Sequence, residues 1–216
     1  MYQLSLPEDL FIELNKGIEI YIENLRGFKQ SNYTFEQYER IFSDFGWYIL
    51  YELKMKDVPI IVNQFENNEI DKADKILIKH FKIRLKHIEN QLIQSFPERK
   101  NILTEAFYAH RKKMFFSSTI LFLSQADGIT ENKIFMGFNF KKFSKNNEKH
   151  PLVLLFKNKN PLTDHFNKGD QNSMNSDCIN RHGIMHGLQQ NYGSELNSLK
   201  ALSFLWFVSN FRNKIE

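Results

Sequence analysis

The stretch from Asp71 to Phe96, DKADKILIKHFKIRLKHIENQLIQSF, decides the fold class. Its apolar residues recur at steps of four, four, three and four, which places them on one face of an α-helix: Leu77, Phe81, Leu85, Ile88 and Leu92. Pro97 follows at once, and because the residue before a proline avoids the helical region, the helix is expected to end there. The stretch therefore predicts a long amphipathic helix that packs on a core.

The opposite face of this predicted helix is basic. At about 100° per residue, the apolar side chains lie opposite four lysines, Lys75, Lys79, Lys82 and Lys86. Such a face is typical of a solvated helix surface, and it also fits a track for the phosphates of a nucleic acid. Both interpretations stay open, and the four lysines are candidate substrate-binding residues.

Helices are also expected before and after this stretch. Apolar spacing and helix-end signals predict them over residues 7–26, from Thr34 onward, over 59–66 and over 98–125. Residues 127–128, Asp-Gly, are expected to end the last of these helices. His110 lies on its apolar stripe, so a buried and hydrogen-bonded histidine is expected there.

The C-terminal quarter is expected to hold two more helices. Ser176 or Asp177 could cap a short one that runs to His186. Ser194 is expected to cap a final helix over 195–212. No stretch reads clearly as a strand, so the sequence predicts an all-α protein, a multi-helix bundle.

The composition fits an ordinary globular protein. Of 216 residues, 42% are hydrophobic and 25% are charged, which suits a sizeable core and argues against disorder. Cys178 is the one cysteine, which excludes a disulfide scaffold and a cysteine-rich zinc site. The N-terminus lacks a basic region before an apolar one, and the longest nearly apolar run, 201–211, is too short to span a bilayer. A cytoplasmic protein with no membrane partner is therefore expected.

The segment 180–187, Asn-Arg-His-Gly-Ile-Met-His-Gly, could carry chemistry. His182 and His186 are four residues apart on one helix face, as a two-histidine metal site requires. A third ligand would have to come from a distant part of the chain, for example from Asp164, His165 or His110. No glutamate follows the first histidine, so the zinc-protease pattern is absent.

Metal-free cleavage of a phosphodiester is the second chemical interpretation of this segment. An imidazole can take the proton from a ribose 2′-hydroxyl or protonate the leaving oxygen, and an arginine can stabilise the negative charge on phosphorus. Arg181 and His186 are about 140° apart around a helix, so two copies facing each other across a two-fold axis would complete a cleft. The net charge of +4 permits an anionic partner such as RNA.

A purely structural interpretation of the same residues also stays open. Arg181 could cap the C-terminus of a neighbouring helix, and His186 could be a core histidine beside Gly187. Asn180 could bond the backbone at the helix start or contact substrate. Tyr192 could stack on a base or pack on the final helix.

The spacing of Arg181 and His186 resembles the R-x4-6-H motif of the HEPN superfamily of small helical bundles, and His182 fits the polar position after the arginine. The wider segments 180–187 and 192–201, with 105–110 and 124–129 upstream, resemble a group of uncharacterised bacterial proteins. The similarity covers roughly residues 97–210. It implies a HEPN-like unit over 97–216 with a helical N-terminal extension over 1–96, the two together forming one compact domain.

Many HEPN proteins are metal-independent endoribonucleases that act as toxins, in phage defence or in RNA processing, and they are typically homodimers with the motif at the interface. The resemblance implies that Arg181 and His186 are the catalytic pair, that His182 assists them, and that no metal or other cofactor is needed. The implied partners are RNA, a second copy of the chain, and an antitoxin or defence-system protein. Other members are inactive, so a non-catalytic module that binds RNA or a protein is the alternative.

Overall fold

The structure, a computed structural model, describes residues 33–49, 53–54, 56–131, 141–142, 144–145, 153, 162 and 179–210. The elements within these ranges are all helical: α2 Phe35–Asp44, α3 Val58–Glu66, α4 Ile70–Ser95, the 3-10 turn η1 Pro97–Arg99, α5 Lys100–Arg111, α6 Phe115–Ile129, α9 Arg181–Met185 and α10 Glu195–Ser209. The predicted all-α bundle is confirmed. The helix expected over 7–26 lies outside the described residues.

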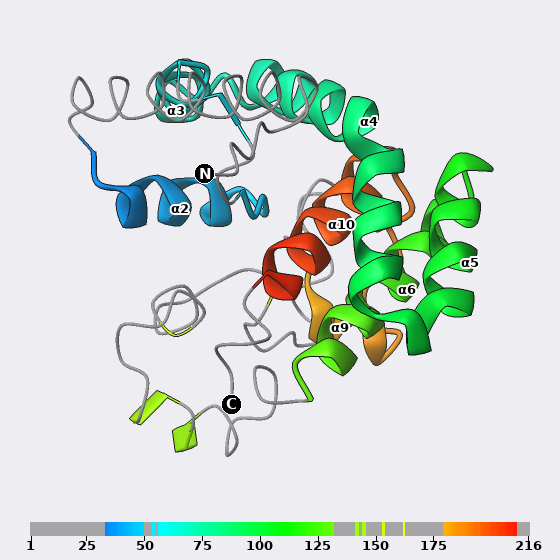
Figure 1. The fold of residues 1–216 in the computed structure, drawn as a ribbon. Coiled ribbons are helices and arrows are strands. Elements are labelled where there is room, and N and C mark those ends of the chain that lie inside the picture. The colour runs from blue at the N-terminus through cyan, green and yellow to red at the C-terminus, as the bar shows by residue number, and fades with distance from the viewer. Residues whose placement is uncertain are drawn as a thin grey trace, which may run out of the picture.

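Helix α10 forms the centre of the bundle. Figure 1 shows it in the middle of the molecule, and it packs against α6 and α4. All of its residues from 197 to 208 are buried, as expected of a helix that is surrounded by others. Among the residues that the structure describes, no helix is long and apolar enough to cross a membrane.

Three of the helix ends expected before α5 are confirmed: the start of α2 at Thr34, the start of α3 at a proline, and the end of α4 before Pro97. Thr34 caps α2 in a reciprocal box, in which its hydroxyl accepts from the Gln37 N–H and the Gln37 side chain accepts from the Thr34 N–H. Proline lies in the first turn of α3, and α4 ends two residues before Pro97. Local sequence signals are strong at each of these positions.

The single helix predicted over 98–125 is wrong, because the chain forms a helical hairpin there. Helix α5 ends at Arg111, Lys113 adopts a left-handed conformation (φ 60°), and α6 begins at Phe115. Neither glycine nor proline marks this turn, so it depends on the packing of α5 and α6 against each other. Helix α6 also continues through Asp127 and Gly128 to Ile129, so residues 127–128 do not end it.

A buried polar junction joins α4, α10 and the segment after α2. The indole Nε1 of Trp47 donates to Oδ1 of Asp74 at 2.7 Å, and the Lys200 ammonium lies 3.9 Å from Oδ2 of Asp74. The Trp47 ring stacks on Phe81, and the Lys200 ammonium lies 5.9 Å from the centroid of the Trp47 ring. A buried carboxylate, a buried ammonium and an indole therefore hold three parts of the chain together.

The expectation for His110 is confirmed. It is buried, and its Nδ1 lies 2.9 Å from the hydroxyl of Ser198, which in turn is 2.6 Å from the hydroxyl of Ser118. Burial lowers the pKa of His110, so the neutral ring is favoured. This chain of contacts links α5, α6 and α10 at the end of the bundle where α6 begins.

We expect the fold to lose stability in mild acid because of His80 on α4. Burial and the Arg84 cation lower the pKa of His80 from 6.5 to about 4, against the opposing effect of Asp57. Between these values the unfolded chain binds a proton that the folded protein excludes, so the free energy of unfolding falls as pH drops from 6.5 towards 4. In urea titrations from neutral pH to about pH 5, His80→Gln should show a shallower decline than wild type.

The neutral His110 leaves a residual decline in both proteins, since its pKa is lowered as well. The informative quantity is therefore the difference between the two pH profiles. Parallel profiles would show that His80 is not responsible.

Candidate functional site

The candidate site is built on the short helix α9, which follows a tightly bonded cap. The side-chain oxygen of Asn180 accepts from the Gly183 N–H at 2.7 Å, and the Asn180 N–H donates to the Gln189 side chain at 2.9 Å. The helix begins at Arg181, so the cap is Asn180 and not Ser176 or Asp177 as expected. Asparagine is among the best N-cap residues, and this one lies at the required distance before Gly183.

Gly187 ends α9 in the way its sequence position indicates. Its φ of 69° lies in the left-handed region, and the chain turns there so that the Leu188 N–H donates to the Gly183 carbonyl at 2.7 Å. With Gln189 bonded to the same carbonyl, the segment 180–189 closes into one small loop. This loop fixes the backbone that carries the arginine and both histidines.

Arg181 is held by an acidic residue from another helix. Its Nη2 donates to Oδ2 of Asp127, which lies in the last turn of α6, and the two side chains are only 20% and 14% exposed. The C-terminal end of a helix carries partial negative charge, so this end of α6 further favours a cation. The contact orients the guanidinium, and it also fits the structural interpretation in which Arg181 caps a neighbouring helix.

The two histidines, one in the first turn of α9 and one at its C-cap, lie side by side. The ring centroids of His182 and His186 are 4.5 Å apart, with an angle of 52° between the planes. His182 is partly buried, whereas His186 is exposed at the turn that leads to Gly187. His186 is therefore not a core histidine, and its imidazole can be reached from solvent.

Two of the predicted substrate-binding residues, Asn180 and Tyr192, make contacts that stabilise the fold. Asn180 is buried, and its side-chain oxygen caps the helix, so it has a structural position. Tyr192 packs edge-on against Phe116 at the other end of α6, with ring centroids 5.1 Å apart, and burial raises its pKa. Asn180 thus supports the backbone of α9, and Tyr192 lies at the end of α6 opposite to Asp127.

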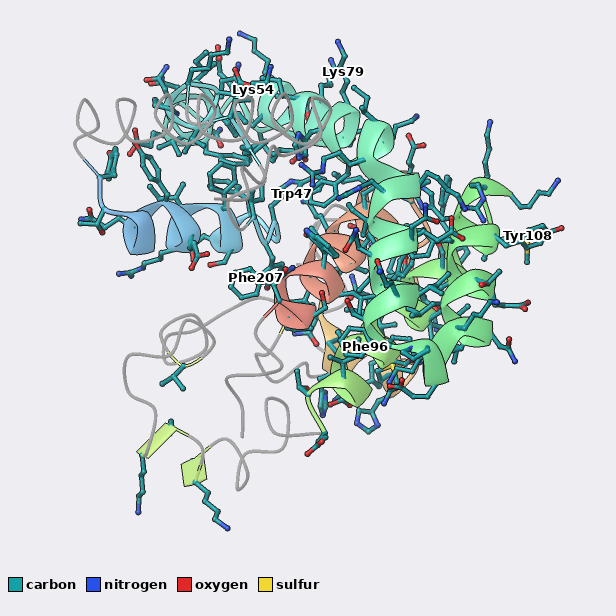
Figure 2. All side chains as sticks on the ribbon, in the orientation of Figure 1. Trp47, Lys54, Lys79, Phe96, Tyr108 and Phe207 are labelled. Carbon is teal, nitrogen blue, oxygen red and sulfur yellow. The ribbon has the colours of Figure 1, made fainter. Side chains whose placement is uncertain are left out.

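The predicted basic face of α4 is also away from α9. Lys82 is paired with Glu195 at 3.0 Å, and Lys86 is paired with Glu89 at 3.2 Å. Lys75 and Lys79 are exposed, and Figure 2 shows Lys79 at the top of the view, whereas α9 lies in the lower half of the same view in Figure 1. Half of this face is thus occupied by ion pairs, as expected of a solvated surface.

The metal interpretation finds no additional ligand nearby. Within the part of the chain that the structure describes, no group of three or more His, Cys, Asp or Glu side chains is placed to hold a metal ion. His110 is bonded to Ser198 at the opposite end of α6 from Asp127. Asp164 and His165 lie outside the described residues.

Asp127 is the site residue whose position the sequence did not reveal. The sequence predicts Asp127 first as part of a helix end and only second as a site residue, and it is 54 positions from Arg181. The only available signal was the upstream segment 124–129 of the bacterial group. Comparisons of the chain with protein-family models, curated proteins and solved structures give no match, so the assignment depends on the motif and the geometry.

Proposed function

We propose that this protein is a metal-independent endoribonuclease of the HEPN type, with its site on α9. The observation that carries the proposal is the arrangement of the two groups about α9, in which an oriented guanidinium, Arg181, begins the helix and an exposed imidazole, His186, is its C-cap. Acid–base catalysis needs a proton carrier that substrate can reach, and His186 is one. Stabilisation of a charged phosphorane needs a fixed cation, and Asp127 fixes Arg181.

In the proposed reaction a ribose 2′-hydroxyl attacks the adjacent phosphate. His186 takes the hydroxyl proton or supplies a proton to the departing 5′-oxygen, and Arg181 stabilises the negative charge on phosphorus. The products are a 2′,3′-cyclic phosphate and a 5′-hydroxyl. His182, in contact with the ring of His186, keeps that ring in position.

The proposal includes a homodimer, in which α9 of each copy faces the other. Met185 supports this arrangement, because it is an apolar side chain on α9 that is 40% exposed directly beside His186. Two copies related by a two-fold axis would bring two arginines and two exposed histidines into one cleft. An antitoxin or another defence protein would then act by covering or separating that interface.

The test is an incubation of purified protein with mixed RNA in excess EDTA, comparing wild type with His186→Ala. General acid–base catalysis is worth about 10²–10⁴-fold in rate, so the variant should lose nearly all cleavage. Because His186 is exposed, the thermal unfolding of the His186→Ala variant should match that of wild type. The 3′ ends of the products should carry the cyclic phosphate.

The second candidate function is a non-catalytic module that binds RNA or a partner protein. The observation that favours it is the ion pair of Arg181 with Asp127, since an arginine that caps α6 needs no catalytic role. RNA binding without cleavage of any RNA would select this alternative. Cleavage that EDTA abolishes, with stoichiometric metal in the purified protein, would select a metalloenzyme instead.

A further inference from the structure

A second surface lies at the end of α6 opposite to Asp127. It comprises side chains from the middle of α4, the end of α5, the following turn and the start of α6, together with the segment before α10. We call it the α5–α6 corner, and its residues are Lys82, Lys86, Tyr108, Arg111, Lys112, Lys113, Phe116 and Tyr192. Figure 2 shows Tyr108 at the outer edge of α5.

Ion pairs hold the cations of the α5–α6 corner next to one another. Arg111 donates to both carboxylate oxygens of Glu89, at 2.9 and 3.2 Å, and Lys86 donates to the same carboxylate at 3.2 Å. Lys82 reaches across to Glu195 at the start of α10. One buried carboxylate thus gathers cations from α4 and α5, and Lys112 and Lys113 follow directly in the chain.

The α5–α6 corner keeps a positive excess. Among the residues that the structure describes, its five cations face three carboxylates, those of Glu89, Glu195 and the exposed Glu105 one turn before Tyr108. The side chain of Glu89 is 3% exposed while that of Lys86 is 76% exposed, so the surface presents the ammonium of Lys86 to solvent and not the carboxylate of Glu89. The basic face continues along α4 through the exposed Lys79 and Lys75.

Two aromatic rings stand among these cations. Tyr108 is 51% exposed, with the Lys112 ammonium 5.7 Å from its ring centroid. Phe116 is 52% exposed. The other side of its ring packs closely on Gly193, where a Cβ, if present, would lie only 2.3 Å from the ring. Tyr192 contacts the same ring edge-on, so Phe116 is held in place while half of it faces solvent.

We propose that the α5–α6 corner binds single-stranded RNA, with a base stacked on Phe116 and the neighbouring phosphates on Lys112, Lys113 and Lys86. Exposed aromatic rings among cations are the features with which proteins hold single strands without reading their sequence. Bases inside a duplex are stacked on each other, so duplex RNA offers only its phosphates to such a surface.

This inference deepens the proposed function, on which it rests for the identity of the ligand. Phe116 and Asp127 are eleven residues apart on α6, about 16 Å along the helix axis, so one strand can contact both the corner and α9.

The test measures binding separately from cleavage. His186→Ala protein is titrated into a fluorescent oligouridine of about twelve nucleotides over a range of salt concentrations. On this background, Phe116→Leu should weaken binding about tenfold and leave the salt dependence unchanged, because it removes stacking and no charge. Lys112→Gln with Lys113→Gln should reduce the slope of log K against log salt by about one to one and a half.

Matched controls come from outside the α5–α6 corner, from the segment between α2 and α3 and from α3 itself. Lys54→Gln removes one exposed lysine and Ile60→Ala removes one exposed apolar side chain, and neither should change the affinity. Gly193→Ala should weaken binding as Phe116→Leu does, because the new Cβ displaces the ring. Thermal unfolding of every variant checks that the bundle is intact.

Three results would overturn the inference: equal affinity for duplex RNA of the same length, unchanged affinity in both corner variants, or binding to anionic lipid vesicles without binding to RNA. If the corner variants weaken RNA binding but the wild-type protein cleaves no RNA, the proposed function alone would be contradicted. If the wild-type protein cleaves RNA but the corner variants bind RNA with unchanged affinity, this inference alone would be contradicted.

Discussion

Replacing Lys200 with methionine is expected to lower the free energy of unfolding by about 3–5 kcal/mol. The side chains of Lys200 and Asp74 are 3% and 7% exposed, so the change leaves a carboxylate in the core without this cation. Asp74 also accepts from Trp47, and the segment after α2 depends on that contact. The loss should appear as a lower urea midpoint in circular dichroism at neutral pH.

The control for this prediction is a double variant that removes both charges of the buried pair, that of Lys200 and that of Asp74. Lys200→Met combined with Asp74→Asn keeps an acceptor for the Trp47 indole and leaves no uncompensated ion, so it should recover much of the lost stability. Losses that simply add in the double variant would show that the two residues are not coupled.

The second large effect is expected at Arg181, where Arg181→Ala should slow RNA cleavage by about 10²–10³-fold. The same change should also destabilise the fold, because the Asp127 carboxylate is only 14% exposed and lies at the negative end of α6. Single-turnover cleavage rates and urea midpoints, measured on one preparation, separate the two effects.

Arg181→Ala combined with Asp127→Ala distinguishes catalysis from helix capping. Removing both charges should restore the urea midpoint, since no uncompensated carboxylate remains, while cleavage should stay lost. If cleavage returns together with stability, the role of Arg181 is structural, and the catalytic role proposed for it is contradicted.

The sequence predicted the elements whose ends are marked locally. The apolar spacing of α4 and the capping residues Thr34 and Ser194 are local signals, and the structure confirms all three. The turn after Arg111 could not be predicted in this way, because it contains Lys112, Lys113 and Met114 in place of glycine or proline. Helical periodicity continues across it, so only the packing of α5 on α6 reveals the break.

The candidate site was predicted in part, for a similar reason. The spacing of Arg181 and His186 is local, and so is the role of Gly187 at the end of α9. The contact of Arg181 with Asp127 joins positions far apart in the chain, and so does that of Lys200 with Asp74. Partners of this kind are fixed by tertiary packing, which a single sequence does not encode in any short pattern.

The burial of α10 on all sides also has a consequence for biosynthesis. Its packing partners α4 and α6 leave the ribosome first, and their apolar faces stay uncovered until residues 195–209 follow. The nascent chain therefore passes through an interval in which it is prone to aggregate and open to chaperones. The described bundle therefore has no finished core until residues 195–209 are available to fill its centre.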